Sequence, residues 1–451
     1  MTGILHRIRR SVTQEPLVPQ TDQERKRFVV HNFILHFRPV RLPAKALRWT
    51  HTFGLGGMGL VLALVLMGTG VLMMFVYEPS PDRAYESILR LQRDVAFGQL
   101  IRNVHHWSAN LLIAVAALHL LRVYFTGAYH PPRQFNWVIG LTLLLCIVVQ
   151  NFTGYLLPWD QLSYWAVTIS TGMVGYVPLV GAWVQEVIRG GPEIGRATLL
   201  TFYAFHTTVV PALLVGFMAW HFWRVRKARG VVVPRGPEEE PSGDLERVLT
   251  VPHLLVREVV VGLVLVGVIL VLSLIANAPL ADAANPGMSP NPAKAPWYFV
   301  GIQELLLHFH PLLAVLVLPL VAVMGLLLIP YVLYERDTSG VFMMSHKGRQ
   351  MAAIAAVTAL LATPVWIVLD EYWIDLAAWL PIVPLSVSTG LIPAAVLLAA
   401  IWGFFTALKK RFSTSNDEAI QACFVLVLVG FAVLTMTGVW FRGPGMALVW
   451  P

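Results

Sequence analysis

The chain has 451 residues, of which 57% are hydrophobic and only 13% are charged, and its formal net charge is +8. Soluble domains carry about a quarter charged residues, so the composition excludes an ordinary soluble protein and predicts a helical membrane protein. The positive charge does not indicate nucleic-acid binding, because lysine and arginine gather beside membrane spans on the cytoplasmic side. The first 25 residues are polar and basic, so no cleaved signal peptide is expected.

Apolar stretches long enough to cross about 30 Å of hydrocarbon recur along the chain and predict an all-α integral membrane fold. The nine expected spans are 54–77, 104–125, 135–157, 202–224, 257–277, 311–334, 351–369, 389–408 and 421–441. The basic segments between them all fall on one side if the N-terminus is cytoplasmic. The C-terminus is then expected outside.

The chain is expected to divide into five segments. These are a basic N-terminal cytoplasmic arm (1–50), a four-helix domain (51–230), a linker (231–249), a three-helix domain (250–370) and two additional spans (371–451). The linker is predicted because VVVPRGPEEEPSGDLERVL combines proline, glycine and a run of charges. Two outer loops, 158–201 and about 281–299, are long enough to suggest a function.

The second and fourth spans each carry two histidines at helical spacing. His105 and His119 are 14 residues apart, so they share one helix face about 21 Å apart along the axis. His206 and His221 are 15 residues apart, which leaves them about 60° off one line. Both spans are expected to run from outside to inside. His105 is therefore expected to face His206 near the outer side, and His119 to face His221 near the inner side.

Two facing pairs of imidazoles predict two b-type haems stacked across the bilayer. A single buried histidine is held by packing contacts about as often as it binds a metal. Four imidazoles without a metal, however, would each need a polar partner inside lipid. His106 lies about 140° around the helix from His119, so it is expected to point elsewhere, towards the headgroups or a loop.

Arginines and glycines accompany the histidines. Arg102 and Arg122 each lie three residues beyond a predicted ligand, where they fit either haem propionate partners or ordinary interfacial arginines. Glycine lets a bulky planar group approach a helix, although it is also common at membrane helix interfaces. Two glycine pairs repeat the 14-residue interval, namely Gly56 with Gly70 in the first span and Gly140 with Gly154 in the third.

Three segments together resemble cytochrome b of the Rieske/cytochrome b quinol-oxidising complexes. They are RNVHHWSANLLIAVAALHLLRVYFTGAYHPPRQFNWVIG, GYLLPWDQLSYWAVTISTG and FYAFHTTVVPALLVGFMAWHFWRVRK. The 15-residue interval in the last segment resembles the photosynthetic branch, in which a four-helix cytochrome b is separate from a three-helix subunit IV. Here both parts are expected to be fused. The resemblance is specific over about 45–230, weaker over 250–370, and absent from the last two spans.

The resemblance implies a Q cycle in an energy-transducing cytoplasmic (inner) membrane. Quinol would be oxidised at an outer site, giving one electron to a Rieske iron–sulfur partner and on to a c-type cytochrome or equivalent acceptor. The other electron would cross both haems to an inner quinone site, which contributes to proton translocation, and the complex would be a homodimer. The quinol-oxidation residues of the family carry over to Pro158, Trp159, Trp297 and Tyr298, and Arg226 matches a basic residue near the inner site.

The outer-site motif departs from the family pattern. The family has Pro-Glu-Trp-Tyr, whose Glu accepts a quinol proton, whereas this chain has Pro296 at the Glu position. Proline cannot accept a proton. The loss of the motif glutamate weakly favours a low-potential quinone such as menaquinone. Glu304, His308 and His310 are the candidate replacements. Glu304 is explained equally well as an interfacial carboxylate near a helix start.

No covalently attached haem is expected. The photosynthetic branch attaches an extra haem to a cysteine just before the first span, where this chain has Gly54. Cys146 and Cys423 lie in apolar spans and form no CxxCH motif.

Two other functions compete with this interpretation. A dihaem quinone-reactive membrane anchor of another dehydrogenase or reductase also uses histidine pairs, but it has little need of a PWD loop and a WYF loop. A transporter could use buried histidines as proton relays, and it would show no b-type absorbance.

Overall fold

Nine long helices dominate the computed structural model, which describes residues 18–32, 35–234, 246–332 and 340–450. Within these ranges all nine are long and apolar enough to cross a membrane, which confirms the predicted all-α membrane fold. The long helical segments are α4 (Leu55–Met74), α6 (Gly98–Phe125), α7 (Gln134–Leu156), α10–η3–α11 (Arg196–Lys227), α12 (Thr250–Ile275), η4–α14–η5 (Leu313–Tyr331), α15 (His346–Tyr372), η6–α17 (Val387–Phe412) and α18 (Asn416–Trp440).

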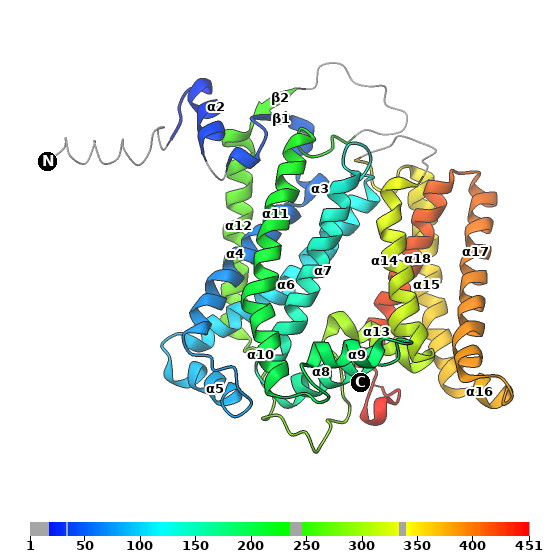
Figure 1. Ribbon diagram of the computed structural model, residues 1–451. Coiled ribbons are helices and arrows are strands. Elements are labelled where there is room, and N and C mark those ends of the chain that lie inside the picture. The colour runs from blue at the N-terminus through cyan, green and yellow to red at the C-terminus, as the bar shows by residue number, and fades with distance from the viewer. Residues whose placement is uncertain (1–17, 33–34, 235–245, 333–339, 451) are drawn as a thin grey trace.

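Short elements cap both ends of the helical body (Figure 1). One end, called here the α2 end, carries α2 (Asp22–His31), η1 (Leu35–Phe37), β1 (Arg41–Pro43), η2 (Ala44–Leu47), α3 (Trp49–Thr52) and β2 (Arg247–Leu249). The other, the α13 end, carries α5 (Ala84–Asp94), α8 (Gln161–Val174), α9 (Gly181–Arg189), α13 (Trp297–His308), α16 (Leu376–Trp379) and η7 (Pro444–Met446). The C-terminus lies at the α13 end, away from α2, as an odd number of crossings requires.

The long helices form two groups in Figure 1. Helices α4, α6, α7, α11 and α12 make the first group, and α14, α15, α17 and α18 make the second. Helix α12 belongs to the first group because Ile269 is buried with Leu62 and Val104, which lie on α4 and α6. The expected boundary at 231–249 therefore does not separate two bundles in space. Residues 235–245 of that linker lie outside the described residues, and β2 pairs antiparallel with β1 of the N-terminal segment.

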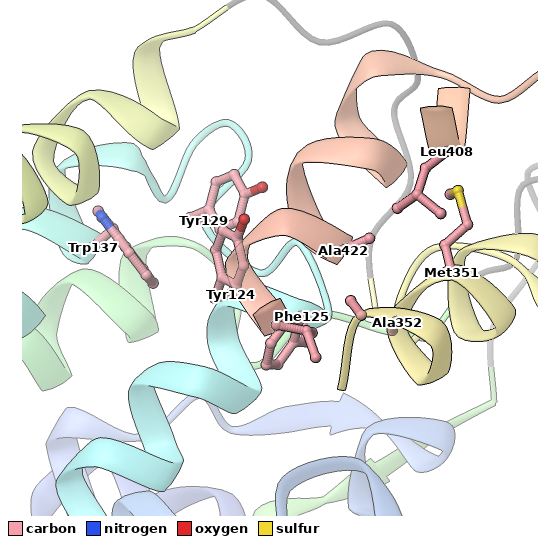
Figure 2. Close-up of a cluster of buried hydrophobic side chains, with 10 residues drawn as sticks. Tyr124, Phe125, Tyr129, Trp137, Met351, Ala352, Leu408 and Ala422 are labelled. Carbon is pink, nitrogen blue, oxygen red and sulfur yellow. The ribbon is translucent and has the colours of Figure 1, made fainter. Parts of the chain in front are cut away.

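The last two spans belong to the second group of helices. Helix α18 packs against α13 and α15. At the α2 end, a cluster of buried side chains connects the two groups (Figure 2). It joins α6, α7 and the turn between them to α15, α17 and α18 through Tyr124, Phe125, Tyr129, Trp137, Met351, Ala352, Leu408 and Ala422.

Helix α6 begins well before its apolar stretch, at Gly98 rather than at residue 104. The added turns are stable because their polar side chains find partners. Arg102 donates to the carbonyls of Ala278 and Pro279 at 2.8 and 2.6 Å, and Asn103 donates to the carbonyl of Ser273 at 2.8 Å. An apolar pattern marks the hydrocarbon-spanning part of a helix, so it cannot show a helix that continues beyond the membrane core.

Three long helices contain a single π turn near the α13 end. In each case a proline follows two residues after the turn: Pro211 after η3 (Phe205–Val209), Pro319 after η4 (Leu313–Val317) and Pro393 after η6 (Val387–Leu391). Proline has no N–H, and its ring clashes with the carbonyl four residues earlier. Widening the preceding turn relieves this clash without breaking the helix.

Candidate functional site

A cavity of about 930 Å³ runs between α4, α6, α7, α11 and α12 and contains all four predicted histidine ligands. Its lining reaches from Trp297 and Tyr298 at the α13 end to Arg38 and Glu258 at the α2 end. The two sites predicted on opposite sides of the bilayer thus share one continuous space.

The histidines meet in the predicted pairs. The ring centroids of His105 and His206 are 6.2 Å apart, and those of His119 and His221 are 6.4 Å apart. Imidazole–metal bonds of about 2 Å on each side fit within these separations. Among the described residues, no group of three or more His, Cys, Asp or Glu side chains is placed to hold a metal. A haem iron needs only two protein ligands, because the porphyrin supplies the other four, so the pairs fit haem.

The π turn η3 contains His206 and resolves the expected 60° offset in this span. Fifteen residues of uninterrupted α-helix would overshoot four turns by about 60°. A π turn accommodates one extra residue, so the remaining rotation falls about 40° short of four turns, as it does between His105 and His119. The 15-residue interval of α10–η3–α11 therefore matches the 14-residue interval of α6.

Hydrogen bonds orient the two imidazoles nearer the α13 end. The His105 Nδ1 atom lies 2.9 Å from the hydroxyl of Thr69, and the His206 Nδ1 atom lies 2.9 Å from the carbonyl oxygen of Gln150. A partner at Nδ1 fixes the ring and leaves Nε2 for a metal, which is how metal-ligating histidines are usually held. Neither Thr69 nor Gln150 is among the residues predicted from the sequence. A polar residue inside an apolar span was the available signal.

Each of the four predicted glycines lies against one of the four histidines. A Cβ added at Gly56, Gly70 or Gly140 would lie 3.5–3.7 Å from the Cε1 atom of His119, His105 or His221, respectively. At Gly154 the added atom would collide with the ring of His206. The glycines thus form a cradle around the histidines that a larger side chain would fill, which supports the fit to a planar group.

The two predicted propionate partners line the cavity and are buried, and both donate hydrogen bonds to protein groups. Arg102 bonds the carbonyls of Ala278 and Pro279. Arg122 donates from Nε to the His51 carbonyl at 2.8 Å, and its Nη2 atom lies 2.9 Å from His51 Nε2, which is also 2.7 Å from the Val232 carbonyl oxygen. Burial and the charge of Arg122 lower the pKa of His51 to about 4, so His51 is a neutral imidazole. The role of Arg102 and Arg122 as propionate partners stays a prediction.

His106 also lines the cavity, but it joins neither histidine pair. Its ring lies 5.0 Å from that of Trp107, and its Nε2 atom is 3.3 Å from the Asn110 amide nitrogen. His106 was expected to point towards the headgroups or a loop. Its contacts with Trp107 and Asn110 are instead made with residues of its own helix, α6.

The two long loops 158–201 and 281–299, which were expected on the outer side, pack on one another. The Asp160 carboxylate accepts from the backbone N–H of Ala281 at 2.9 Å, and the Gln161 N–H donates to the Asp282 carbonyl at 2.8 Å. Of the predicted quinol-site residues, Pro158, Trp297 and Tyr298 line the main cavity. Trp159 does not, since its ring is buried against Tyr164.

A second cavity, of about 300 Å³, lies between α8 and α13. Of its described lining residues only Lys294 is charged. The lining includes Phe152, Trp165, Ile169, Phe299, Ile302 and Gln303. This mostly apolar pocket beside the WYF segment is suited to a hydrophobic ring.

Glu304 lines neither described cavity and is completely buried. It is therefore not the interfacial carboxylate considered as the alternative. Its Oε1 atom accepts from Arg442 Nη2 at 2.5 Å and lies 3.4 Å from His308 Nε2. A role in quinol proton transfer stays a prediction, but these contacts favour a structural role. His308 and His310, the other candidates, line neither cavity.

Arg226 is placed differently from its predicted role. It lies on α11 beyond His221, but it is not among the residues that line the main cavity. Arg38, which is supplied by the N-terminal segment, lines that end instead and pairs with Glu258 at 2.8 Å. The sequence did not predict Arg38, because its approach to α12 depends on how the N-terminal segment folds.

Comparisons with known proteins agree with this geometry. The profile described as Cytochrome b/b6/petB matches residues 43–229. Cytochrome b6 of Synechococcus sp. (strain CC9605) is 47% identical over 173 residues, which are 38% of this chain and 79% of that protein. Cytochrome b6 of Prochlorococcus marinus (strain MIT 9303) is 46% identical over the same shares. A chain of the structure "Hyperthermophilic respiratory Complex III" has a similar fold, with TM-score 0.61 and 20% identity over 86% of this chain and 91% of that chain.

Fold and site together define a class, the helical membrane proteins that transfer electrons through b-type haem. The chain belongs to the cytochrome b/b6 family. The family profile ends at residue 229, whereas the structural likeness covers most of the chain, so the helices of the second half also follow a known arrangement.

The absence of a cysteine near Gly54 gives a direct prediction. All haem should leave the chain in acidified acetone, and the denatured polypeptide should not stain for haem, because no thioether can form at this position. A stained band at the mass of this chain would contradict the prediction.

Proposed function

We propose that this chain is the electron-transfer subunit of a quinol:cytochrome c reductase-type complex with two b-type haems. The haem nearer the α13 end would be held by His105 and His206, and the other by His119 and His221. The observation that carries the proposal is the placement of both histidine pairs in one cavity that extends towards both ends of the molecule.

When bound, the haems would accept and donate one electron at a time. The residues of this chain set the distance that the electrons cross. Fourteen residues of α6 hold the two sites about 21 Å apart along the helix axis. Most of the surface that lines the cavity is apolar.

Quinol oxidation is proposed at the α13 end, in the second cavity and the adjoining wall of the main cavity. Trp297 donates from Nε1 to the Asn110 side chain at 2.7 Å, which ties the start of α13 to α6 beside His106. Loops 158–201 and 281–299 pack on each other at the same end of the molecule. Gln303 donates to the Ala293 carbonyl at 2.6 Å and accepts from the Ala295 N–H at 2.8 Å, so it holds the turn that precedes Trp297.

Quinone reduction is proposed at the α2 end, where the cavity lining includes Arg38 and Glu258. Basic residues of the chain gather at this end, which supports a cytoplasmic N-terminus in an energy-transducing membrane. The proposed partners are a Rieske iron–sulfur protein, a c-type cytochrome or equivalent acceptor, and a second copy of this chain.

The test uses the purified complex and its visible spectrum. We expect two b-type components, and we expect a pulse of high-potential oxidant to increase haem b reduction while quinol is present. The increase follows because the first quinol electron leaves for the oxidant and the second has only the haems as acceptor. A quinone-reactive anchor of another enzyme would show haem oxidation only, and a proton-relay transporter would show no b-type spectrum.

A further inference from the structure

Helix α18, which lies outside the family profile, is fitted closely to α13. A Cβ at Gly301 of α13 would lie 2.5 Å from the Thr435 hydroxyl, and a Cβ at Gly438 of α18 would lie 2.9 Å from Val300 Cγ2. Each helix thus presents a glycine where the other presents a side chain. The two helices cannot shift along this contact without a collision.

An ion cluster locks the far end of the same contact. Arg442, just beyond α18, donates from Nε to both Glu304 carboxylate oxygens at 3.0 and 3.1 Å. Its Nη1 atom donates to Glu371 at 2.9 Å and to the Met446 carbonyl at 2.9 Å. His308 connects Glu304 to Asp370, whose carboxylate lies 2.6 Å from His308 Nδ1. The guanidinium therefore binds α13, α15 and the C-terminal turn at once.

Within the cluster, the hydrogen bonds and charges of neighbouring groups outweigh the effect of burial on the pKa values of Glu304 and His308. Burial alone would raise the pKa of Glu304, but the hydrogen bonds and charges of His308 and Arg442 outweigh it and hold the pKa below its usual value. Burial alone would lower the pKa of His308, but Asp370 and Glu304 outweigh it and raise the pKa. Glu304 is thus stabilised as a carboxylate, and its lowered pKa makes it a weak acceptor for a quinol proton.

The loop before α13 is held from the same side. Lys294 donates to the carbonyl of Val439 near the end of α18 at 2.9 Å, and the Gly445 N–H donates to the Asn291 side chain at 2.5 Å. Lys294 also lines the second cavity. The C-terminal segment therefore contacts the loop before α13 at two points and the last turns of α13 at a third.

The opposite face of α13 forms the wall of the second cavity through Phe299, Ile302 and Gln303. We propose that α18 and Arg442 are a positioning element of the outer quinol site, which holds α13 at a fixed distance from α8 and so sets the width of that cavity. The inference rests on the proposed function, and it gives the last helix of the chain a role. Arg442 acts through α13 and is a positioning residue.

The test compares variants in the intact complex, with tetramethylhydroquinone as the quinol. Arg442→Gln and Glu304→Gln remove the charge contact, whereas Gly438→Ala spreads α18 from α13 and keeps every charged residue of the cluster. Arg90→Gln is the matched control, because Arg90 forms an exposed 2.7 Å pair with Glu78. Gly403→Ala is the control for the glycine change, because a Cβ there meets nothing within 4 Å.

We expect the three test variants to raise the KM for the quinol about tenfold with a smaller change in kcat, because small displacements of a site wall weaken substrate positioning. Hydrogen exchange in residues 297–308 should become faster, while the b-type spectrum is unchanged. The double variant of Glu304 and Arg442 should resemble each single variant, because the two groups act as a unit. Arg442→Lys should restore part of the KM.

The proposal would be overturned if Arg442→Gln had the same KM for the quinol as the wild type and the same rate of hydrogen exchange in residues 297–308. If Arg442→Gln loses its haems through unfolding, wild-type behaviour of Gly438→Ala would overturn it instead. A Glu304→Gln variant that alone loses turnover and shifts the pH profile would make Glu304 a proton acceptor. If the wild type oxidises no quinol, the proposed function fails, and the exchange of 297–308 alone decides whether Arg442 holds α13.

Discussion

Replacing His105 with alanine is expected to remove the haem nearer the α13 end and to leave the other haem bound. His105 and His206 face each other with ring centroids 6.2 Å apart, and removal of one ring leaves the iron with a single protein ligand. Haem extracted per chain should fall from two to one. A redox titration should lose one of its two b-type components, and electron transfer from quinol to the second haem should stop.

His106→Ala is the matched control for this prediction. The side chain has the same type, lies one residue away and lines the same cavity, but it faces no second histidine. Asn110 keeps its 2.9 Å bond to the His106 carbonyl after the change, so the loss of one neutral hydrogen bond should cost about 0.5–1.5 kcal/mol. Both haems should remain. Retention of two haems in His105→Ala, or loss of one in His106→Ala, would show that the wrong member of the pair was assigned.

Gly154→Ala is expected to have the largest effect of any single-methyl change near the histidines. The added Cβ would overlap the His206 ring, and this ring is held at Nδ1 by the Gln150 carbonyl, so it cannot move aside without losing that bond. The displaced imidazole should leave the iron. The b-type component nearer the α13 end should then lose its low-spin spectrum, or its affinity for haem should fall at least about tenfold, which corresponds to about 1.4 kcal/mol.

Gly140→Ala tests whether this effect comes from the specific collision. A Cβ at Gly140 would lie 3.7 Å from the Cε1 atom of His221, which is ordinary van der Waals contact. We expect Gly140→Ala to retain both spectral components. Equal loss in the two variants would mean that contact with a bound planar group, and not the position of the histidine, determines the effect.

Residue spacing was sufficient to predict the histidine pairs. The 14-residue interval of α6 constrains two side chains to one face of a regular helix, and apolar spans of known direction determine which histidines can meet. The predicted angle between His206 and His221 was less accurate, because a sequence interval does not show whether the helix contains a π turn. Pro211 was the available signal, since a proline in an apolar span requires some local adjustment.

Predictions for polar side chains depended more on tertiary structure. Arg102 and Arg122 were expected beside haem propionates, and both line the cavity, but the carbonyls of 278–279 and the backbone of His51 also compete for them. Glu304 was considered for proton transfer because it follows the WYF segment. Its partner Arg442 is 138 residues away in sequence, so only the packing of α18 on α13 reveals the pair.

The sequence by itself determined the membrane class, the nine spans, the four histidines and their pairing, because burial in lipid and helical periodicity act locally along the chain. Tertiary structure decided which helices share a bundle, where loops 158–201 and 281–299 meet and which helices the last span packs against. These features depend on contacts between residues far apart in sequence, such as Gly438 with Val300 and Arg442 with Glu304, and no local pattern encodes them.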